Sequence, residues 1–343
     1  KSFEGKGHFR WTEYIQCRSD EGVRLCLLWD WKIILSELPM HLLFIVNPVS
    51  GAGTGKKLPE IIRFMPEYQG LDYEILFSEY AGHARILAAA AIKKKKYTHI
   101  IAVGGDGTVN EVGGALYGSE IAFGIVSIGS GNGFARHLGY STRMKKALRQ
   151  VLSGAYAYVD MLEMNGLYSL NVSGVGFDAE VAHEFNRLKR RGVFSYIYAG
   201  LKMWFRYTEQ EYKITVNGKI LNERCFILSF ANSSQFGNNA SIAPHASLKD
   251  GLVDICLLKR PKYWILVPFL FALMSSRIDK MGFYNELQCP EALIEGNIYR
   301  VHIDGDAAFM TSPIYLKVHR AVLKTVVPKY AHQRCGDFEG SSL

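Results

Sequence analysis

Short apolar runs alternate with helix-like segments along the first half of the chain. Each run has the length of a buried strand, about four to eight residues, and the run near 99–103 is rich in Ile and Val. This alternation of strand and helix is typical of a doubly wound α/β domain, in which helices cover both faces of a mostly parallel sheet. The predicted strands lie near residues 42–46, 72–77, 99–103 and 121–128, and the predicted helices near 56–64, 82–95, 109–117 and 132–152.

From about Tyr156 the pattern changes to short strands separated by turn signals. Asn165-Gly166 and Asn217-Gly218 each lie between apolar runs, and this dipeptide favours the type I′ turn of a β-hairpin because both of its residues tolerate positive φ. We therefore expect an antiparallel β-sandwich in the second half of the chain. Its predicted strands lie near residues 156–162, 167–173, 211–216, 224–231, 252–258 and 298–303.

Composition and charge agree with two ordinary domains, since 48% of the 343 residues are hydrophobic. The longest apolar candidate, Tyr263 to Met274, is interrupted by Pro268 and is shorter than the ~18–20 residues that cross a bilayer. The formal net charge of +8 suits an anionic membrane or a polyanionic cofactor. Because the sequence shows neither zinc-ligand spacing nor a known nucleic-acid-binding motif, we expect no nucleic acid as partner. The six cysteines show no pairing pattern, which predicts reduced thiols in a cytoplasmic protein.

The glycine-rich segment Gly104-Gly105-Asp106-Gly107-Thr108 directly follows the third predicted strand. Glycines let backbone N–H groups approach a phosphate, and the N-terminus of the next helix adds unpaired donors and a partial positive charge. Asp106 would oppose that field unless it held a metal, a hydroxyl or a water. Glycines for phosphate with one carboxylate for a cation or a proton are the chemistry of nucleotide-dependent phosphoryl transfer.

Two further glycine-rich loops follow the first and the fourth predicted strands. The loop that starts at Asn47 is not a Walker A loop, because its spacing to Gly55-Lys56 is one residue short and Lys57 replaces the Ser or Thr that holds magnesium. The other loop spans residues 129–133. Since the C-terminal ends of parallel strands meet at one edge of a sheet, the three loops predict a single nucleotide site there.

Together these motifs resemble the diacylglycerol kinase catalytic-domain superfamily, and within it the soluble bacterial lipid kinases, which are related to sphingosine kinases. The resemblance runs from about Met40 to about Pro328. The segments that carry it are Asn47-Pro-x-Ser50-Gly51, Ser78-x-x-x-Gly82-His83-Ala84, Gly104-Gly-Asp-Gly-Thr108-x-Asn110-Glu111, Gly129-Ser130-Gly131-Asn132-x-Phe134-Ala135-Arg136, Asn171-x-x-Gly174-x-Gly176-Phe177-Asp178 and Ile303-Asp304-Gly305-Asp306.

The resemblance implies an α/β ATP-binding domain of residues 40–158 with about 317–330, because the last strand is expected to return to it, and a β-sandwich lipid-substrate domain of residues 159–316. Residues 1–39 precede the first methionine and lack the regions of a signal peptide, so we expect an extension outside the fold. A regulatory or membrane-touching arm is the alternative. Residues 331–343 are expected to form a polar tail.

In function, the resemblance implies an ATP-dependent lipid kinase that uses Mg²⁺ and transfers the γ-phosphate of ATP to a lipid hydroxyl. Diacylglycerol, which would give phosphatidic acid, is the first expected acceptor. Gly129-Ser130-Gly131-Asn132-Gly133 stands where diacylglycerol kinases usually show Gly-Thr-Gly-Asn-Asp, so a sphingoid long-chain base is the second. An NAD kinase-like enzyme, which would share the Gly-Gly-Asp-Gly-Thr loop, and a non-catalytic ATP-binding regulator are alternatives from other classes.

The resemblance also implies the site residues. The proton acceptor would be Asp306, which stands where the family usually has Glu, with Asp304 and Asp106 as further candidates. For Ser78 and Ser130 the alternative is N-capping of the following helix. The expected ATP-binding residues are Asn47, Pro48, Val49, Ser50, Gly51, Ser78, Gly104, Gly105, Asp106, Gly107, Thr108, Val109, Asn110 and Ser130.

A structural Mg²⁺ is expected at Ser247, Asp250 and Leu252, where relatives use one carboxylate and main-chain carbonyls. An ordinary turn at Asp250-Gly251 is the alternative.

Two apolar segments preceded by basic residues suggest contact with a membrane. Cationic residues beside an apolar helix face can dock on an anionic bilayer, although such helices also commonly pack on their own domain. We therefore expect a cytoplasmic, peripherally membrane-associated enzyme with its lipid substrate at the membrane surface; a homodimer is compatible with the sequence. The basic residues are Arg187, Lys189, Arg190 and Arg191 before the segment that starts at Val193, and Lys259, Arg260 and Lys262 before Tyr263–Met274.

Overall fold

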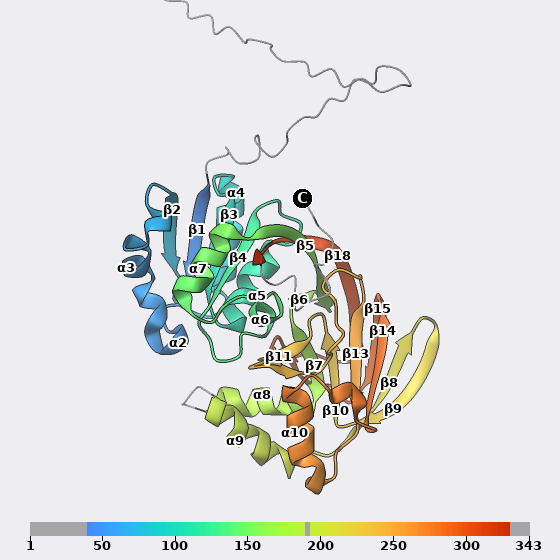
Figure 1. The fold of residues 1–343 in the computed structure, drawn as a ribbon. Helices are drawn as coiled ribbons and strands as arrows, with labels where there is room; N and C mark the ends of the chain where they lie inside the picture. The colour runs from blue at the N-terminus through green and yellow to red at the C-terminus, as the bar shows by residue number, and fades with distance from the viewer. Residues whose placement is uncertain (1–39, 189–192, 330–343) are drawn as a thin grey trace, which may run out of the picture. The chain divides into compact units, whose positions relative to one another are not determined.

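The computed structural model describes residues 40–188 and 193–329 (Figure 1). The expected extension 1–39, the tail 331–343 and the basic residues Lys189, Arg190 and Arg191 lie outside the described residues.

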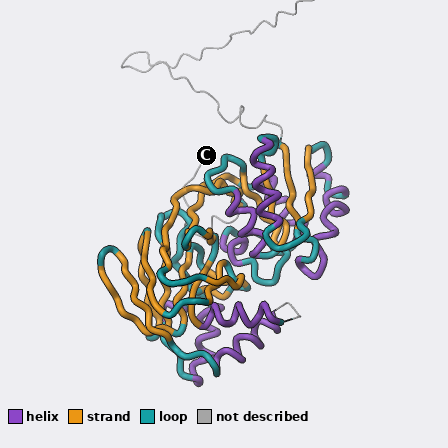
Figure 2. Tube along the Cα trace, turned by 180° about the vertical axis from the view of Figure 1, so that it is seen from behind, coloured by secondary structure: helices purple, strands orange, loops and turns teal. Residues whose placement is uncertain are grey.

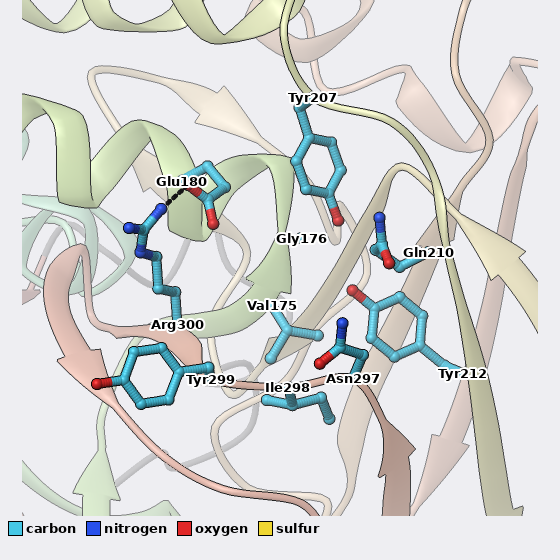
Figure 3. Close-up of a pocket in the computed structure, with 10 residues that line it drawn as sticks. All are labelled: Val175, Gly176, Glu180, Tyr207, Gln210, Tyr212, Asn297, Ile298, Tyr299 and Arg300. Atoms are coloured by element: carbon cyan, nitrogen blue, oxygen red, sulfur yellow. Dashed lines mark hydrogen bonds and ion pairs between the residues drawn. The ribbon is translucent and has the colours of Figure 1, made fainter.

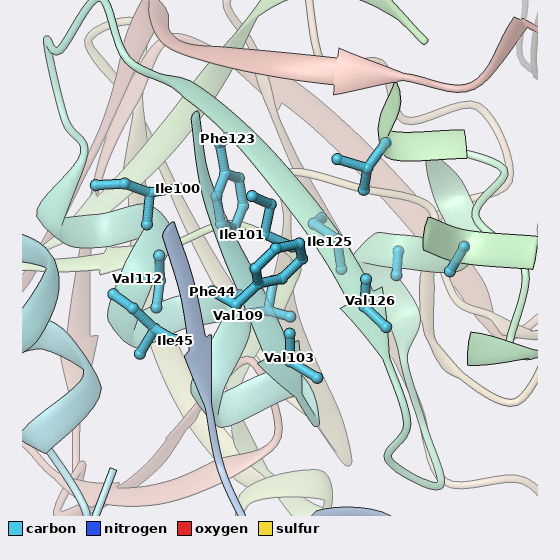
Figure 4. Packing of buried hydrophobic residues seen from close by; sticks show 14 of the residues in the cluster. Phe44, Ile45, Ile100, Ile101, Val103, Val109, Val112, Phe123, Ile125 and Val126 are labelled. Atoms are coloured by element: carbon cyan, nitrogen blue, oxygen red, sulfur yellow. The ribbon is translucent and has the colours of Figure 1, made fainter. Parts of the chain in front are cut away.

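Four parallel strands form the centre of the first domain, in the order β2-β1-β3-β4. They are β1 (His41–Val46), β2 (Asp72–Phe77), β3 (His99–Gly104) and β4 (Ala122–Ser127). The strands β3 and β4 are buried along their whole length, as expected when helices cover both faces of a parallel sheet. Phe44, Ile101 and Phe123 pack with Val109 and Val112 in this core (Figure 4). The predicted α/β class is confirmed.

The helices of this domain agree with the sequence pattern at most positions. The exception is the single helix predicted over 132–152, which is wrong: the chain forms two helices separated by a loop. Gly139, in that loop, has φ +80, which an α-helix cannot contain. The helices are α2 (Ser50–Gly53), α3 (Leu58–Arg63), α4 (His83–Lys94), α5 (Asp106–Ala115), α6 (Gly133–His137) and α7 (Met144–Ser153), with the 3₁₀ turns η1 (Thr54–Lys57) and η2 (Pro66–Tyr68).

The second half of the chain forms two facing sheets, which confirms the predicted antiparallel sandwich. One is a six-stranded sheet of order β14-β13-β10-β7-β16-β17, and the other contains β15, β8 and β9 beside β18 and β5. Both Asn-Gly hairpin turns are confirmed, since all four residues have positive φ between paired strands. The strands are β5 (Ala155–Met164), β6 (Leu167–Ser169), β7 (Val172–Gly176), β8 (Gln210–Val216), β9 (Lys219–Cys225), β10 (Ile227–Ala231), β11 (Gln235–Gly237), β12 (Ala240–Ser241), β13 (Val253–Leu258), β14 (Tyr284–Cys289), β15 (Glu291–Gly296), β16 (Arg300–Ile303), β17 (Asp306–Phe309) and β18 (Ile314–Val327).

Apolar side chains fill both faces of the six-stranded sheet. Leu228 and Ile255 face Ile214 and Ile294 of the other sheet across the sandwich core. On the opposite face, Phe226 belongs to a second cluster beneath three helices, which lie along one side of the strands (Figures 1 and 2). These helices are α8 (Phe177–Arg187), α9 (Val193–Trp204) and α10 (Leu266–Met274), with the 3₁₀ turns η3 (Tyr263–Ile265) and η4 (Ile278–Lys280).

The long strand β18 belongs to both domains. Its first residues pair with β15, whereas Thr325 near its end pairs in parallel with Phe123 of β4. Along most of its length β18 is antiparallel to β5, with a register shift between His319 and Leu323. The sheet of the α/β domain therefore continues into the sandwich without a break.

Among the described residues, every helix falls short of the length and apolar character that a membrane crossing requires.

Two carboxylic acids meet inside the six-stranded sheet. Asp254 is fully buried, accepts a hydrogen bond from Gln288 Nε2 at 2.8 Å, and shares a second hydrogen bond with Glu286. Burial, followed by the hydrogen bond to Glu286, raises the pKa of Asp254 to about 8. Asp254 therefore carries a proton in the folded protein at neutral pH, but loses it on unfolding.

This pair predicts a stability that falls as pH rises. The folded state binds the extra proton between about pH 4 and pH 8, so the unfolding free energy should decrease over that window, by up to about 1.4 kcal/mol per pH unit. Asp254→Asn keeps an acceptor for Gln288 and a donor for Glu286, and should flatten this dependence. Thermal unfolding between pH 6 and pH 9 measures it. An unchanged slope in the variant would show that Asp254 is not the titrating group.

Candidate active site

Two of the predicted glycine-rich loops touch each other at the C-terminal ends of β3 and β4. A Cβ placed on Gly129 would lie 2.7 Å from the Cα of Gly105, so only glycine permits this approach of the two backbones. A Cβ on Gly131 would lie 2.9 Å from Asp106 Oδ2. The loops are thus brought together at one edge of the sheet.

Asp106 ties the two loops together. Its carboxylate, at the start of α5, accepts hydrogen bonds from the backbone N–H groups of Asn132 and Gly133, each at 2.8 Å. Burial raises the pKa of Asp106 to about 6, with smaller contributions from the carboxylates of Asp304 and Asp306, although the two N–H donors act in the opposite direction. Three carboxyl groups therefore gather here.

The loop after β1 lies at the same edge. The N–H of Asn47 donates to Val103 O of β3 at 2.9 Å, and the Asn47 side chain accepts the N–H of Val49 at 3.1 Å. Gly51 has φ +59, and a Cβ on it would lie 2.6 Å from the carbonyl oxygen of Ile128, just after β4. Pro48 and Ser50 lie in this same turn.

Neither Ser78 nor Ser130 caps a helix, so the N-capping alternative is wrong. Ser78 is buried after β2 and donates to Val46 O at 3.4 Å, whereas Ser130 is exposed in its loop. The residues that precede α4 and α6 are Gly82 and Asn132.

The N-terminus of α4 is instead capped by Glu111 of α5. Its two carboxylate oxygens accept the N–H groups of Gly82 at 2.7 Å and Ala84 at 3.0 Å. A carboxylate at a helix N-terminus complements the helix dipole and satisfies unpaired donors. The motif that contains Glu111 does not indicate this role, because the partners of Glu111 are 27 and 29 residues away in the chain.

Two residues predicted to bind ATP serve packing. Thr108 is buried, and its side chain covers the Cα of Gly104, where a Cβ would collide with it. The side chain of Val109 lies in the hydrophobic core and its N–H donates to Gly105 O at 3.1 Å. These contacts do not support a polar contact of Val109 with ATP.

Asp304 is a buried and fully hydrogen-bonded carboxylate. Oδ1 accepts Ser169 Oγ at 2.6 Å and Asn171 N at 2.9 Å, and Oδ2 accepts Leu170 N at 2.9 Å and Asn110 Nδ2 at 2.8 Å. Burial nevertheless raises its pKa. Because Asn110 belongs to α5, Asp304 links the sandwich to the helix that follows the Gly-Gly-Asp-Gly-Thr loop. No lone pair faces a substrate, so the geometry disfavours Asp304 as a base.

The segment Asp304-Gly305 is at the same time a hairpin turn. Its φ values of +51 and +89 connect β16 to β17, where Ile303 pairs with Asp306. The turn alternative is therefore confirmed, and the side chain of its first residue anchors the turn to the neighbouring loop.

Asp306 follows this turn and is exposed. Its Oδ2 lies so close to Gly107, in the first turn of α5, that a Cβ there would overlap it. Asp306, Gly107 and Asn110 line a cavity of about 330 Å³ together with Arg85 and Tyr168. Asp306 is thus the candidate acid that faces open space at the glycine loop.

A buried pair of Asp178 and His302 stabilises the turn between β16 and β17. Asp178 accepts Ser229 Oγ at 2.7 Å and contacts His302 Nε2 at 3.1 Å, and the N–H of Gly305 donates to His302 Nδ1 at 3.3 Å. His302 therefore carries its proton on Nε2 and positions the turn before Asp306. The role of His302 was not predicted.

The predicted structural Mg²⁺ residues form a turn. Asp250 Oδ1 accepts Leu252 N at 2.9 Å, Ser247 Oγ accepts Lys249 N at 3.2 Å, and Gly251 has φ +76. Across residues 40–188 and 193–329, no group of three or more His, Cys, Asp or Glu side chains is arranged to hold a metal ion. The turn alternative is confirmed, and the Mg²⁺ site stays a prediction.

A second cavity, of about 270 Å³, lies within the sandwich domain (Figure 3). An ion pair between Arg300 and Glu180, 2.6 Å apart, lies on one side, and Tyr207 and Tyr212 lie on the other. Burial raises the pKa of Tyr207 to about 12, so its hydroxyl stays neutral. This cavity contains none of the predicted site residues.

Comparison with known proteins identifies the family. Residues 41–164 match the family described as diacylglycerol kinase catalytic domain, and residues 171–308 match the YegS C-terminal NAD kinase beta sandwich-like domain. A protein of Pseudomonas savastanoi pv. phaseolicola named "Probable lipid kinase YegS-like" is 30% identical over 73% of this chain and 85% of its own length. The chain belongs to the diacylglycerol kinase-like family of lipid kinases. The suspected family is confirmed, and a kinase that uses ATP is supported over a regulator without turnover.

Further similar proteins also carry the name diacylglycerol kinase. A protein of Bacillus subtilis (strain 168) named diacylglycerol kinase is 27% identical over 85% of this chain and 98% of its own length. The crystal structure of a diacylglycerol kinase from Bacillus anthracis str. Sterne superposes with a TM-score of 0.65 at 20% identity, covering 86% of this chain and 99% of that one. At that identity the structural likeness shows the fold.

Proposed function

We propose that this lipid kinase transfers the γ-phosphate of ATP to the hydroxyl of diacylglycerol and forms phosphatidic acid. The observation that supports this most is the contact of Asp306 with Gly107. It brings a carboxylate of the sandwich hairpin beside the helix N-terminus and glycine loop that suit phosphate groups. An acceptor hydroxyl bound against the hairpin would then lie next to the γ-phosphate.

Each group has a role in this proposal. Backbone N–H groups of the loops after β1, β3 and β4 bind the phosphates, with Ser78 and Ser130 at the edges. The lipid oxygen attacks the γ-phosphorus, the bond from this phosphorus to the β–γ bridging oxygen breaks, and ADP leaves. Asp306 takes the hydroxyl proton. Asp304 has no proton-accepting role, because four donors already occupy it.

The carboxyl group of Asp106 fits a catalytic Mg²⁺ that is bound mainly through the nucleotide. Mg²⁺ usually combines one or two carboxylates with phosphate oxygens and waters. Asp106 would supply such a carboxylate, and a bound cation would offset the burial that raises the pKa of Asp106 to about 6. When bound, the ion would neutralise the phosphate oxygens of ATP.

A sphingoid long-chain base is the second candidate acceptor. The motif Gly129-Ser130-Gly131-Asn132-Gly133 departs from the usual diacylglycerol kinase form and favours a sphingoid long-chain base as the alternative. The relatives that carry the name diacylglycerol kinase favour the first acceptor.

The test supplies the purified protein with γ-labelled ATP, Mg²⁺, extracted mixed lipids in detergent and NAD as a soluble acceptor. We expect the label in phosphatidic acid. Label in a sphingoid-base phosphate would show that the acceptor is a sphingoid base and not diacylglycerol. Label in a soluble dinucleotide, without labelled lipid, would overturn the proposal. Asp306→Glu restores the usual family residue and should retain activity, whereas Asp306→Asn should lower it by about 10²-fold or more.

A further inference from the structure

The helix α10 is apolar on both of its faces. One face packs on its own domain through Phe269, Ala272 and Leu273, and Phe269 meets Trp204 of α9 with ring centroids 6.4 Å apart. The other face and the preceding turn η3 leave six large apolar side chains exposed. They are Tyr263, Trp264, Val267, Leu270, Phe271 and Met274, which we call the α10 face.

This surface is unusual for a helix at the outside of a domain, whose solvent side is normally polar. Val267 is 75% exposed and Phe271 is 69% exposed, next to residues of the same kind. Exposed apolar patches of this kind mark contact sites rather than ordinary surface. Packing on its own domain, the alternative to membrane contact, therefore accounts for one face of α10.

Positive charge surrounds the α10 face. Lys259 and Lys262 precede it, and Arg277 and Lys280 follow it; all four are exposed, and none of them forms an ion pair within the described part of the chain. Lys262 Nζ lies 5.2 Å from the ring centre of Trp264. The one acid of this stretch, Asp279, faces His245 at 3.6 Å. The charge therefore complements an anionic partner.

Trp and Tyr beside Lys at the edge of an apolar surface are typical of the boundary between lipid headgroups and acyl chains. The nine residues of α10 extend over only ~14 Å, far less than the ~30 Å hydrocarbon core, so the helix can lie in the interface but cannot cross it. The geometry suits an in-plane amphipathic anchor with a basic rim.

We propose that the α10 face docks on an anionic bilayer and holds the kinase at the surface that contains its lipid. The inference that docking serves catalysis rests on the proposed function. The contact between the α10 face and the bilayer does not depend on turnover. Apolar side chains would enter the headgroup boundary, while Lys259, Lys262, Arg277 and Lys280 approach anionic headgroups.

The test measures co-sedimentation of the full chain with vesicles, without ATP. Vesicles of phosphatidylcholine alone are compared with vesicles of equal parts phosphatidylcholine and phosphatidylserine. We expect the wild type to bind the anionic vesicles more tightly, and Phe271→Glu to lower that binding by about tenfold or more, since it removes an exposed aromatic ring that would enter the bilayer and adds a negative charge. Lys262→Glu with Lys280→Glu should also weaken it, and added salt should weaken the wild type.

Phe64→Glu is the matched control, because Phe64 is 72% exposed in the α/β domain, outside the α10 face. It should bind vesicles like the wild type, and thermal unfolding should show both Phe variants folded. Equal vesicle binding by Phe271→Glu and the wild type overturns the proposal. So does a dimer of the wild type that Phe271→Glu dissociates while vesicle binding stays unchanged, because the face would then be an interface between two copies.

Turnover on detergent-dispersed lipid separates this inference from the proposed function. Phe271→Glu should phosphorylate dispersed lipid at the wild-type rate and lose rate only on anionic vesicles. A wild type that binds vesicles through this face but labels no lipid would refute the proposed reaction and leave the docking surface standing.

Discussion

Replacement of Asp106 by Asn is expected to lower kcat by about 10³-fold while the protein stays folded. The amide can accept only one of the two N–H groups that the carboxylate now accepts, from Asn132 and Gly133. It also removes the negative charge that would help to hold Mg²⁺ between the glycine loops. Transfer of label from γ-labelled ATP to lipid measures kcat, and thermal unfolding checks the fold.

Replacement of Asp306 by Asn distinguishes the role of Asp306 from that of Asp106. If Asp306 takes the proton, its amide variant loses kcat with an unchanged KM for ATP, since it lies on the hairpin and not in a phosphate-binding loop. A wild-type rate for Asp106→Asn would refute a catalytic role of the glycine-loop acid. A loss of less than tenfold for Asp306→Asn, beside a large loss for Asp106→Asn, would transfer the base to Asp106.

Replacement of Asp304 by Ala is expected to cost about 3–5 kcal/mol of unfolding free energy. Four donors would lose their acceptor at once: the buried Ser169, Leu170 and Asn171, which have little access to water, and the half-buried Asn110. Because Asn110 belongs to the α/β domain and the other three to the sandwich side, this loss also weakens the link between the hairpin and α5. Chemical denaturation measures the change.

Asp306→Ala is the natural control for that experiment, since the two acids are two residues apart and Asp306 is exposed. We expect a change in unfolding free energy of less than about 1 kcal/mol for it, but a large loss of activity. Equal destabilisation by the two substitutions would show that Asp304 is not the anchor that its contacts indicate.

The sequence pattern predicted the α/β sheet well because its strands are local signals. The runs that became β1 and β3 are short, apolar and followed by glycine-rich turns, and this length with these flanking residues distinguishes a buried strand from a helix. The two Asn-Gly hairpins were equally local, since the dipeptide alone provides the positive φ that the turn needs.

Prediction failed where distant contacts decide the outcome. The segment 224–231 was expected to be one strand, but it divides at Phe226 into β9 and β10, which belong to different sheets. Strands β14 and β15 were not predicted, because their mixed apolar and polar residues follow no clear period, and only pairing with the neighbouring strands β13 and β18 defines them.

By itself, the sequence determined the fold class, the glycine-rich loops and the acids Asp106, Asp304 and Asp306, because glycine spacing and apolar period act through neighbouring residues. Only the tertiary structure decided how these acids differ: four donors from separate segments surround Asp304, whereas Asp306 faces a cavity beside Gly107. The tertiary structure also shows that one apolar side of α10 is exposed and does not pack on its own domain. Burial and hydrogen-bond partners depend on residues far apart in the chain, and a linear pattern does not contain them.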